Sequence, residues 1–89
     1  MQIVFDRSFS KSLDKLKNKA IKLKIIKLIE KIEEANNLQE LAHVKKLEGF
    51  KTFYRIRIGD YRLGVEQESE SQIRFIIIAH RKDIYKLFP

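Results

Sequence analysis

The spacing of apolar residues along the chain changes from that of a strand to that of helices and back again. Residues 2–5 include a short β-prone apolar run, which predicts a first strand. Over residues 9–17 and 19–35, apolar residues recur every three or four positions and so share one face of a helix. We predict two helices with these bounds, packed as a hairpin, and expect Ser8 or Ser10 to cap the first one.

The segment that follows the helices lacks a clear period. We expect Asn36-Asn37 to end the second helix, because asparagine tolerates the left-handed backbone that closes many helices. Residues 38–44 are then a connector. The stretch 45–49, Lys-Lys-Leu-Glu-Gly, is expected to form a short edge strand, since lysines on an edge discourage pairing with other chains.

Three further strands complete the pattern. Residues 53–58 and 61–67 alternate between apolar and polar side chains, which is typical of strands with one buried face. Residues 73–79 are apolar at almost every position and fit a central strand covered on both faces. With a tail over 83–88 of at most one helical turn, the order β-α-α-β-β-β predicts an α+β fold in which both helices cover one face of a small, twisted, mainly antiparallel sheet.

The segment YRIRIGDYRL, residues 54–63, is expected to be a hairpin whose two loop residues are Gly59 and Asp60. This register pairs Ile58 with Tyr61, Arg57 with Arg62, Ile56 with Leu63, Arg55 with Gly64 and Tyr54 with Val65. Because side chains alternate between faces, the apolar residues form the core face and the three arginines share the other face. Directly opposed like charges destabilise a strand pair by about 0.2–1 kcal/mol, so the arrangement requires another explanation.

Two interpretations of the arginines remain open. Glu66 and Glu68 could neutralise them, in which case nothing binds there. The interpretation that we favour is an anion site, because guanidinium groups match phosphate oxygens well and three of them converge. Gly64 would leave bare backbone opposite Arg55, with room for a ligand or a flat guanidinium.

Composition and charge narrow the class of protein. Residues 1–89 are expected to form one domain, and without cysteine the chain can form neither disulfides nor thiolate metal sites. His43 and His80 show no metal-ligand spacing, so we expect no metal. The N-terminus lacks a signal-peptide or membrane-span pattern, and we expect a cytoplasmic protein. A formal charge of +7 favours an anionic partner, either nucleic acid or an acidic protein.

The helices carry much of this charge, with eight lysines and two acids between Lys11 and Lys31. We favour a solvated outer face, because lysines on amphipathic helices commonly serve solubility. The alternative is a surface that contacts phosphates without reading sequence.

The end of the chain adds groups that could do chemistry on RNA. The segment from Ala79 to Tyr85 contains His80, Arg81 and Lys82. Cleaving RNA through its own 2′-hydroxyl requires a group that takes the hydroxyl proton, cations that hold the charge on phosphorus, and an acid for the leaving 5′-oxygen. A tyrosine and a histidine beside several arginines could meet these needs.

The phrases FYRIRIGDYRLGVE and HRKDIY together resemble the RelE/ParE superfamily of toxins from type II toxin–antitoxin systems, in particular its RelE-like branch. The resemblance covers essentially the whole chain, a single RelE-like toxin domain over residues 1–89. It implies a ribosome-dependent endoribonuclease that cuts mRNA in the A site, leaving a cyclic phosphate and a 5′-hydroxyl, without metal or other cofactor.

The resemblance also implies roles for individual residues. Tyr85 corresponds to the general base, Arg81 to a stabiliser of the phosphate or leaving group, and Arg55, Arg57 and Arg62 to the phosphate cradle, with His80 as a further candidate for proton transfer. The expected RNA-binding residues are Lys45, Lys46, Lys51, Arg55, Arg57, Arg62 and Lys82. The best-studied ribonuclease members carry lysines at the positions of Arg55 and Arg57, and arginine scarcely transfers protons.

Two other functions remain open: a ParE-like inhibitor of DNA gyrase, and a catalytically weak homologue that only binds its antitoxin. The resemblance implies as partners a cognate antitoxin, the ribosome and mRNA, but no membrane. We expect the antitoxin to mask Arg55, Arg57 and Arg62 or to displace the tail at Tyr85.

Overall fold

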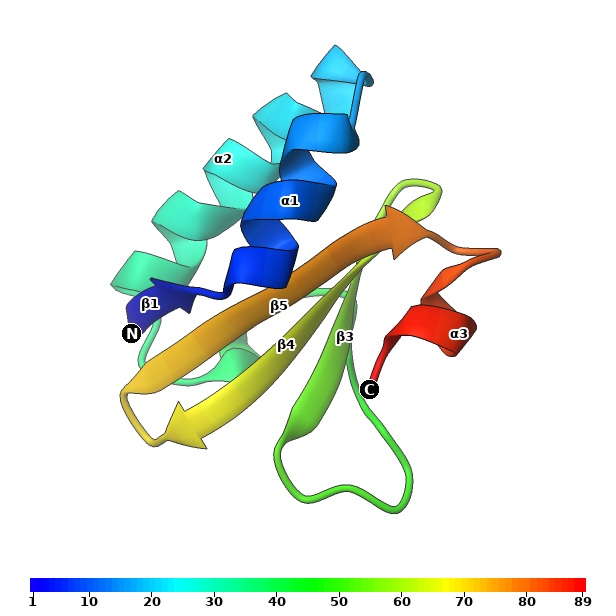
Figure 1. The fold of residues 1–89 in the computed structure, drawn as a ribbon. Coiled ribbons are helices and arrows are strands. Elements are labelled where there is room, and N and C mark those ends of the chain that lie inside the picture. The colour runs from blue at the N-terminus through cyan, green and yellow to red at the C-terminus, as the bar shows by residue number, and fades with distance from the viewer.

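Five strands form a single sheet, with two long helices on one face and a short C-terminal helix on the other (Figure 1). The computed structural model describes all of residues 1–89. The elements are β1 (Gln2–Phe5), α1 (Arg7–Lys15), α2 (Lys19–Glu34), a 3₁₀ turn (Leu38–Glu40), β2 (Val44–Lys46), β3 (Phe53–Ile58), β4 (Tyr61–Ser69), β5 (Gln72–His80) and α3 (Ile84–Leu87). The sheet order is β1-β5-β4-β3-β2, with β1 parallel to β5 and all other pairs antiparallel. The predicted α+β, mainly antiparallel fold is confirmed.

The first helix begins earlier than predicted because Asp6, not Ser8 or Ser10, caps it. The Asp6 carboxylate accepts hydrogen bonds from the backbone N–H of Ser8 at 3.1 Å and from its hydroxyl at 2.7 Å. The Ser10 N–H donates to the Asp6 carbonyl, as an i to i−4 bond of the first turn does. An aspartate satisfies the free N–H groups of a helix start as well as serine does.

The prediction for the end of α2 is also wrong in its mechanism. Ala35 closes the helix with an extended backbone at φ −75°, and neither asparagine adopts a positive φ. Asn37 instead caps the 3₁₀ turn, since its side chain accepts from the Glu40 N–H at 3.2 Å. The amino group of Met1 donates to the carbonyls of Ile32, Glu33 and Ala35 at 2.9–3.1 Å, which satisfies the last turn of α2.

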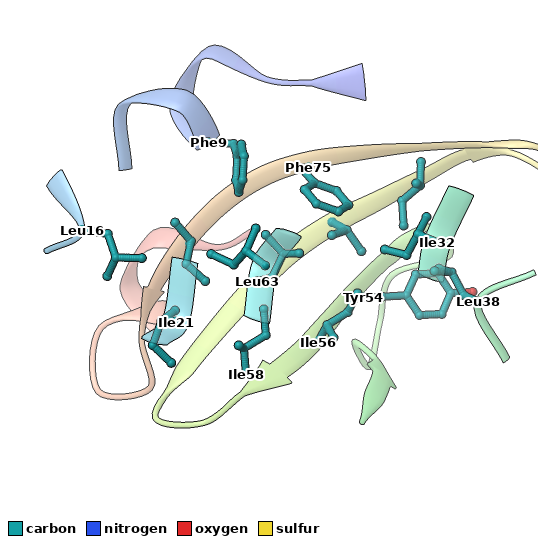
Figure 2. Packing of buried hydrophobic residues seen from close by; sticks show 14 residues of the cluster. Phe9, Leu16, Ile21, Ile32, Leu38, Tyr54, Ile56, Ile58, Leu63 and Phe75 are labelled. Carbon is teal, nitrogen blue, oxygen red and sulfur yellow. The ribbon is translucent and has the colours of Figure 1, made fainter. Parts of the chain in front are cut away.

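The main core lies between the two long helices and the sheet (Figure 2). Helix residues such as Phe9 and Ile25 meet strand residues such as Leu63 and Phe75, all at most 2% exposed. A second, smaller cluster lies on the opposite face of the sheet and consists of Leu47, Ala79, Ile84 and Phe88. This cluster fastens the C-terminal tail to the sheet.

The strand predictions hold in position, although the bounds of three strands change, with β5 extending by one residue at each end to Gln72–His80. The edge strand β2 covers Val44–Lys46 rather than 45–49, and β4 runs on to Ser69. As predicted, β5 lies inside the sheet, between β1 and β4. No helix of the structure combines the length and the apolar character needed to span a membrane.

Candidate functional site

The hairpin of β3 and β4 has the predicted register, with Ile58 opposite Tyr61 and Arg57 opposite Arg62. Gly59 has a φ of +57° at the first loop position, which suits glycine and a tight two-residue turn. The Arg57 N–H points away from β4 and donates to the His43 carbonyl at 3.1 Å. Arg57 and Arg62 are therefore a non-hydrogen-bonded pair, the type in which opposed side chains lie closer together.

The arginines line a cleft of about 400 Å³ on the face of the sheet away from the two long helices. Its lining, which we call the arginine cleft, consists of His43, Val44, Lys45, Arg55, Arg57, Arg62 and Tyr85. The Arg55 guanidinium lies over the Tyr85 ring, 4.6 Å from the ring centroid. The Tyr85 side chain is otherwise open to solvent, with 74% of the residue exposed. The structure thus brings the predicted general base together with the three arginines.

Tyr85 sits on the short helix α3, which is held at both ends by buried side chains. Ile84 is fully buried and Phe88 is 4% exposed. The Phe88 ring lies directly over Gly64, where a Cβ would come within 2.6–2.8 Å of three ring atoms. The expectation of open backbone at Gly64 is therefore wrong: Phe88 fills that space, and the glycine permits the tail to dock.

Further contacts orient the guanidinium groups. The Arg57 Nη2 lies 3.0 Å from His43 Nδ1, and Arg62 Nη1 donates to the carbonyls of Gly59 and Tyr61 at 2.9 Å each. His43 has a left-handed backbone, with φ 65°. Sequence reasoning did not assign His43 to the site, because its contact with Arg57 crosses between neighbouring strands and leaves no local pattern.

No carboxylate neutralises the cluster. Both ion pairs of the structure are made by Arg74, with Asp6 at 3.5 Å and Glu68 at 2.9 Å. Hydrogen bonds from Ser8, with help from Arg74, lower the pKa of Asp6, and the hydrogen bond from Arg74 lowers that of Glu68. Glu66 accepts from the Thr52 hydroxyl at 3.0 Å. The alternative in which Glu66 and Glu68 neutralise the arginines is therefore wrong.

Arg81 lines a second and larger cleft of about 600 Å³, which continues around the hairpin turn toward α2. We call it the α2 cleft; its lining residues are Lys24, Lys27, Leu28, Lys31, Leu41, Ala42, His43, Ile56, Arg57, Ile58, Gly59, Asp60, Arg62 and Arg81. The two clefts have His43, Arg57 and Arg62 in common. Arg81 thus lines the α2 cleft with Arg57 and Arg62, whereas Tyr85 lines the arginine cleft with the same pair.

His80 does not join this cluster. It pairs with Tyr61 across β4 and β5, and the two rings meet edge to face at 5.5 Å on the helix side of the sheet. A bulge in β5 causes this, because Phe75 pairs with Val65 whereas Ile77 pairs with Gly64. The extra residue, Ile76, shifts all later side chains to the other face.

The predicted RNA-binding lysines are placed differently from one another. Lys45 lines the arginine cleft, and Lys46 lies beside it in a neighbouring hollow that Arg55 and Tyr85 also border. Lys51 and Lys82 line neither the arginine cleft nor the α2 cleft. The site as found is an open basic surface with a tyrosine, and it contains no group of three or more His, Cys, Asp or Glu side chains that could hold a metal.

Comparison with known proteins places this geometry in a family. Residues 3–85 match the family described as the ParE toxin of the type II toxin–antitoxin system parDE. The chain is 37% identical over 90 residues to toxin RelE3 of Methanocaldococcus jannaschii, and the alignment covers both chains completely.

The fold of the chain is also similar to that of chains in two solved toxin–antitoxin complexes. The chain superposes on a protein in the RelB–RelE antitoxin–toxin complex from Methanococcus jannaschii with a TM-score of 0.82 and 35% identity, covering 97% of this chain and 99% of the other. A chain of the toxin–antitoxin complex RelBE2 from Mycobacterium tuberculosis has the same fold, with a TM-score of 0.58 at 19% identity over 90% of this chain and 96% of that one.

Proposed function

Since the chain belongs to the RelE/ParE superfamily of toxins from type II toxin–antitoxin systems, we propose that it is a ribosome-dependent endoribonuclease that cuts mRNA in the A site and so inhibits translation. The observation that carries the proposal is the exposed Tyr85 ring beneath the Arg55 guanidinium, in a cleft that Arg57 and Arg62 also line. A gyrase-binding surface would not need a titratable phenol among phosphate-binding groups.

The proposed reaction uses the RNA's own 2′-hydroxyl. Tyr85, acting as general base in its phenolate form, takes the proton and becomes the neutral phenol while the 2′-oxygen attacks the adjacent phosphorus. Arg55, Arg57 and Arg62 hold the phosphate and stabilise the negative charge that builds up on its oxygens. The bond from phosphorus to the 5′-oxygen breaks, which leaves a cyclic phosphate on one fragment and a 5′-hydroxyl on the other.

We assign proton transfer to Tyr85 rather than to the arginines or His80. Arginine holds its proton too tightly to donate it, and His80 lies on the helix face of the sheet. The departing 5′-oxygen then takes its proton from solvent, to which the cleft is open. Arg81, which lines the α2 cleft with Arg57 and Arg62, is assigned to the phosphate on the leaving side of the cut.

We propose that a cognate antitoxin inhibits the nuclease activity. Related chains are described in complexes with RelB-type antitoxins, which supports such a partner here. An antitoxin would inhibit by covering Arg55, Arg57 and Arg62 with acidic side chains, or by lifting α3 and moving Tyr85. A complex in which both the arginines and α3 are untouched would contradict this mechanism.

Purified protein added to programmed ribosomes tests the proposal. We expect cleavage of the mRNA at the A-site codon, with 2′,3′-cyclic phosphate ends, and little cleavage of the same mRNA without ribosomes. Cleavage that is equal with and without ribosomes would contradict ribosome dependence, and no cleavage in either case would contradict the nuclease.

The ParE-toxin family match favours a second candidate, inhibition of DNA gyrase. A supercoiling assay with the same preparation separates the two functions. Under the nuclease proposal the protein leaves supercoiling unchanged at concentrations that cleave mRNA.

A further inference from the structure

The α2 cleft carries a charge pattern that the proposed cleavage chemistry does not use. Lys24, Lys27 and Lys31 follow one another at intervals of three and four residues, so they lie on one face of α2. All three are exposed, and none forms an ion pair. Like charges at this spacing destabilise a helix, and Glu30 and Glu34, three residues beyond Lys27 and Lys31, form no ion pair with these lysines.

The opposite wall of the cleft is also cationic. Arg57, Arg62 and Arg81 line the same cleft as the three lysines, and Asp60 is the one carboxylate in the lining. Arg62 is held at the turn by its two carbonyl contacts, and Arg57 by His43. With six positive side chains and one negative side chain in its lining, this cleft favours the binding of a polyanion.

The two clefts adjoin, because His43, Arg57 and Arg62 line both. A strand whose reactive phosphate lies beside Tyr85 can therefore pass the hairpin turn and enter the α2 cleft. The cleft lining contains no Phe, Tyr or Trp on which a base could stack, and its one imidazole, His43, contacts Arg57, so most of the contacts that it can make are with phosphates rather than with base faces.

We propose that the α2 cleft binds the backbone of the mRNA strand next to the cut, through Lys24, Lys27 and Lys31, without sequence preference. This inference rests on the proposed function, since it takes the occupant of the arginine cleft to be RNA. It replaces the interpretation of these three lysines as a merely solvated face.

Salt-dependent RNA binding tests the inference. In a Tyr85→Phe background that does not cut, the triple variant Lys24→Gln, Lys27→Gln, Lys31→Gln is compared with the control Lys11→Gln, Lys15→Gln, Lys17→Gln, which removes the same charge from exposed positions outside the cleft. The probe is a fluorescent single-stranded RNA. Removing three phosphate contacts should lower the slope of log K against log salt by about 2 and weaken binding about equally for all sequences.

The control variant should change the slope of log K against log salt by much less. Both triple variants should unfold cooperatively on heating, which shows that they are folded. Equal slopes for the two triples would overturn the inference, as would a loss of antitoxin binding with RNA binding unchanged. Cleavage on ribosomes is a second measurement, made with both triple variants in a chain that keeps the native Tyr85. The variant with the three substitutions in the α2 cleft should raise KM and leave kcat nearly unchanged. If the parent chain binds RNA through the cleft but never cuts it, the nuclease proposal fails and the cleft assignment stands.

Discussion

The identity of each cationic residue decides what the site can do. Arginine at positions 55 and 57 provides a planar, permanently charged fork that binds phosphate oxygens and stacks on an aromatic ring, as Arg55 does on Tyr85. Arginine does not shuttle protons as lysine can. The proposed mechanism therefore assigns proton transfer to Tyr85, which shares the arginine cleft with His43 and Lys45.

Replacing Tyr85 by phenylalanine separates binding from chemistry. The ring remains beneath Arg55, so we expect the fold and RNA affinity to be retained, while kcat falls by about 10²–10⁴-fold because the base is lost. Single-turnover cleavage on ribosomes and RNA binding are the two measurements. A variant that still cuts at the parent rate would remove Tyr85 from the mechanism.

Acid stability should report the carboxylates around Arg74. The folded pKa values of Asp6 and Glu68 lie below their usual 3.8 and 4.5. Their stabilisation is therefore complete above those values and is lost as the pH falls through the lower folded values. We expect Asp6→Asn with Glu68→Gln to lower the melting temperature at neutral pH and to flatten its fall below about pH 4.5. Glu70→Gln, an exposed position without an ion pair, is the control.

The β3–β4 hairpin carries two features that stability alone would not favour. It opposes Arg57 and Arg62 in a close pair, and no acid compensates. The same hairpin carries Gly64, whose missing side chain lets the tail dock and brings Tyr85 to the cluster. Both features are unfavourable or unnecessary for a bare hairpin and useful for a phosphate site.

Substitutions at Arg57 should therefore move stability and binding in opposite directions. We expect the free energy of unfolding to increase in the order Arg57, Arg57→Gln, Arg57→Glu, by about 0.2–1 kcal/mol in total. RNA affinity should decrease in the same order. Denaturant unfolding and RNA titration check the two trends, and a loss of stability along the series would show that the arginine pair is not strained.

The tail should fail to dock when Gly64 gains a side chain. In Gly64→Ala the new methyl group would overlap the Phe88 ring, so we expect faster hydrogen exchange over residues 83–89 and at least about tenfold less cleavage, as expected when a catalytic group is misplaced. In Phe88→Ala the clash partner is absent. Adding Gly64→Ala to that variant should then cost little more, and this non-additivity identifies the contact. If the effects of the two substitutions simply add, Gly64→Ala does not act through the contact with Phe88.

The complete fold shows which features a sequence reveals. Alternation and a two-residue turn define the register of β3 and β4, so the shared face of Arg55, Arg57 and Arg62 could be predicted. The contact between His43 and Arg57, the docking of Phe88 on Gly64 and the bulge at Ile76 that turns His80 away depend on how separate elements meet. No local period encodes them.

The location of the positive charge, like these contacts, becomes clear only in the folded molecule. A net +7 suggested an anionic partner without locating it. The fold gathers lysines of α2 and arginines of the sheet around two connected clefts, while the paired Arg74 lies at a distance along the sheet. This arrangement fits a single strand that bends around the hairpin turn.

Mapping of mRNA 5′ ends after brief induction of the chain in cells tests the proposed nuclease most directly. We predict new 5′-hydroxyl ends inside translated reading frames, in phase with the codons, which disappear with Tyr85→Phe or Arg81→Ala. Growth inhibition without such ends, or ends that ignore the reading frame and persist in both variants, would contradict ribosome-dependent cleavage at this site.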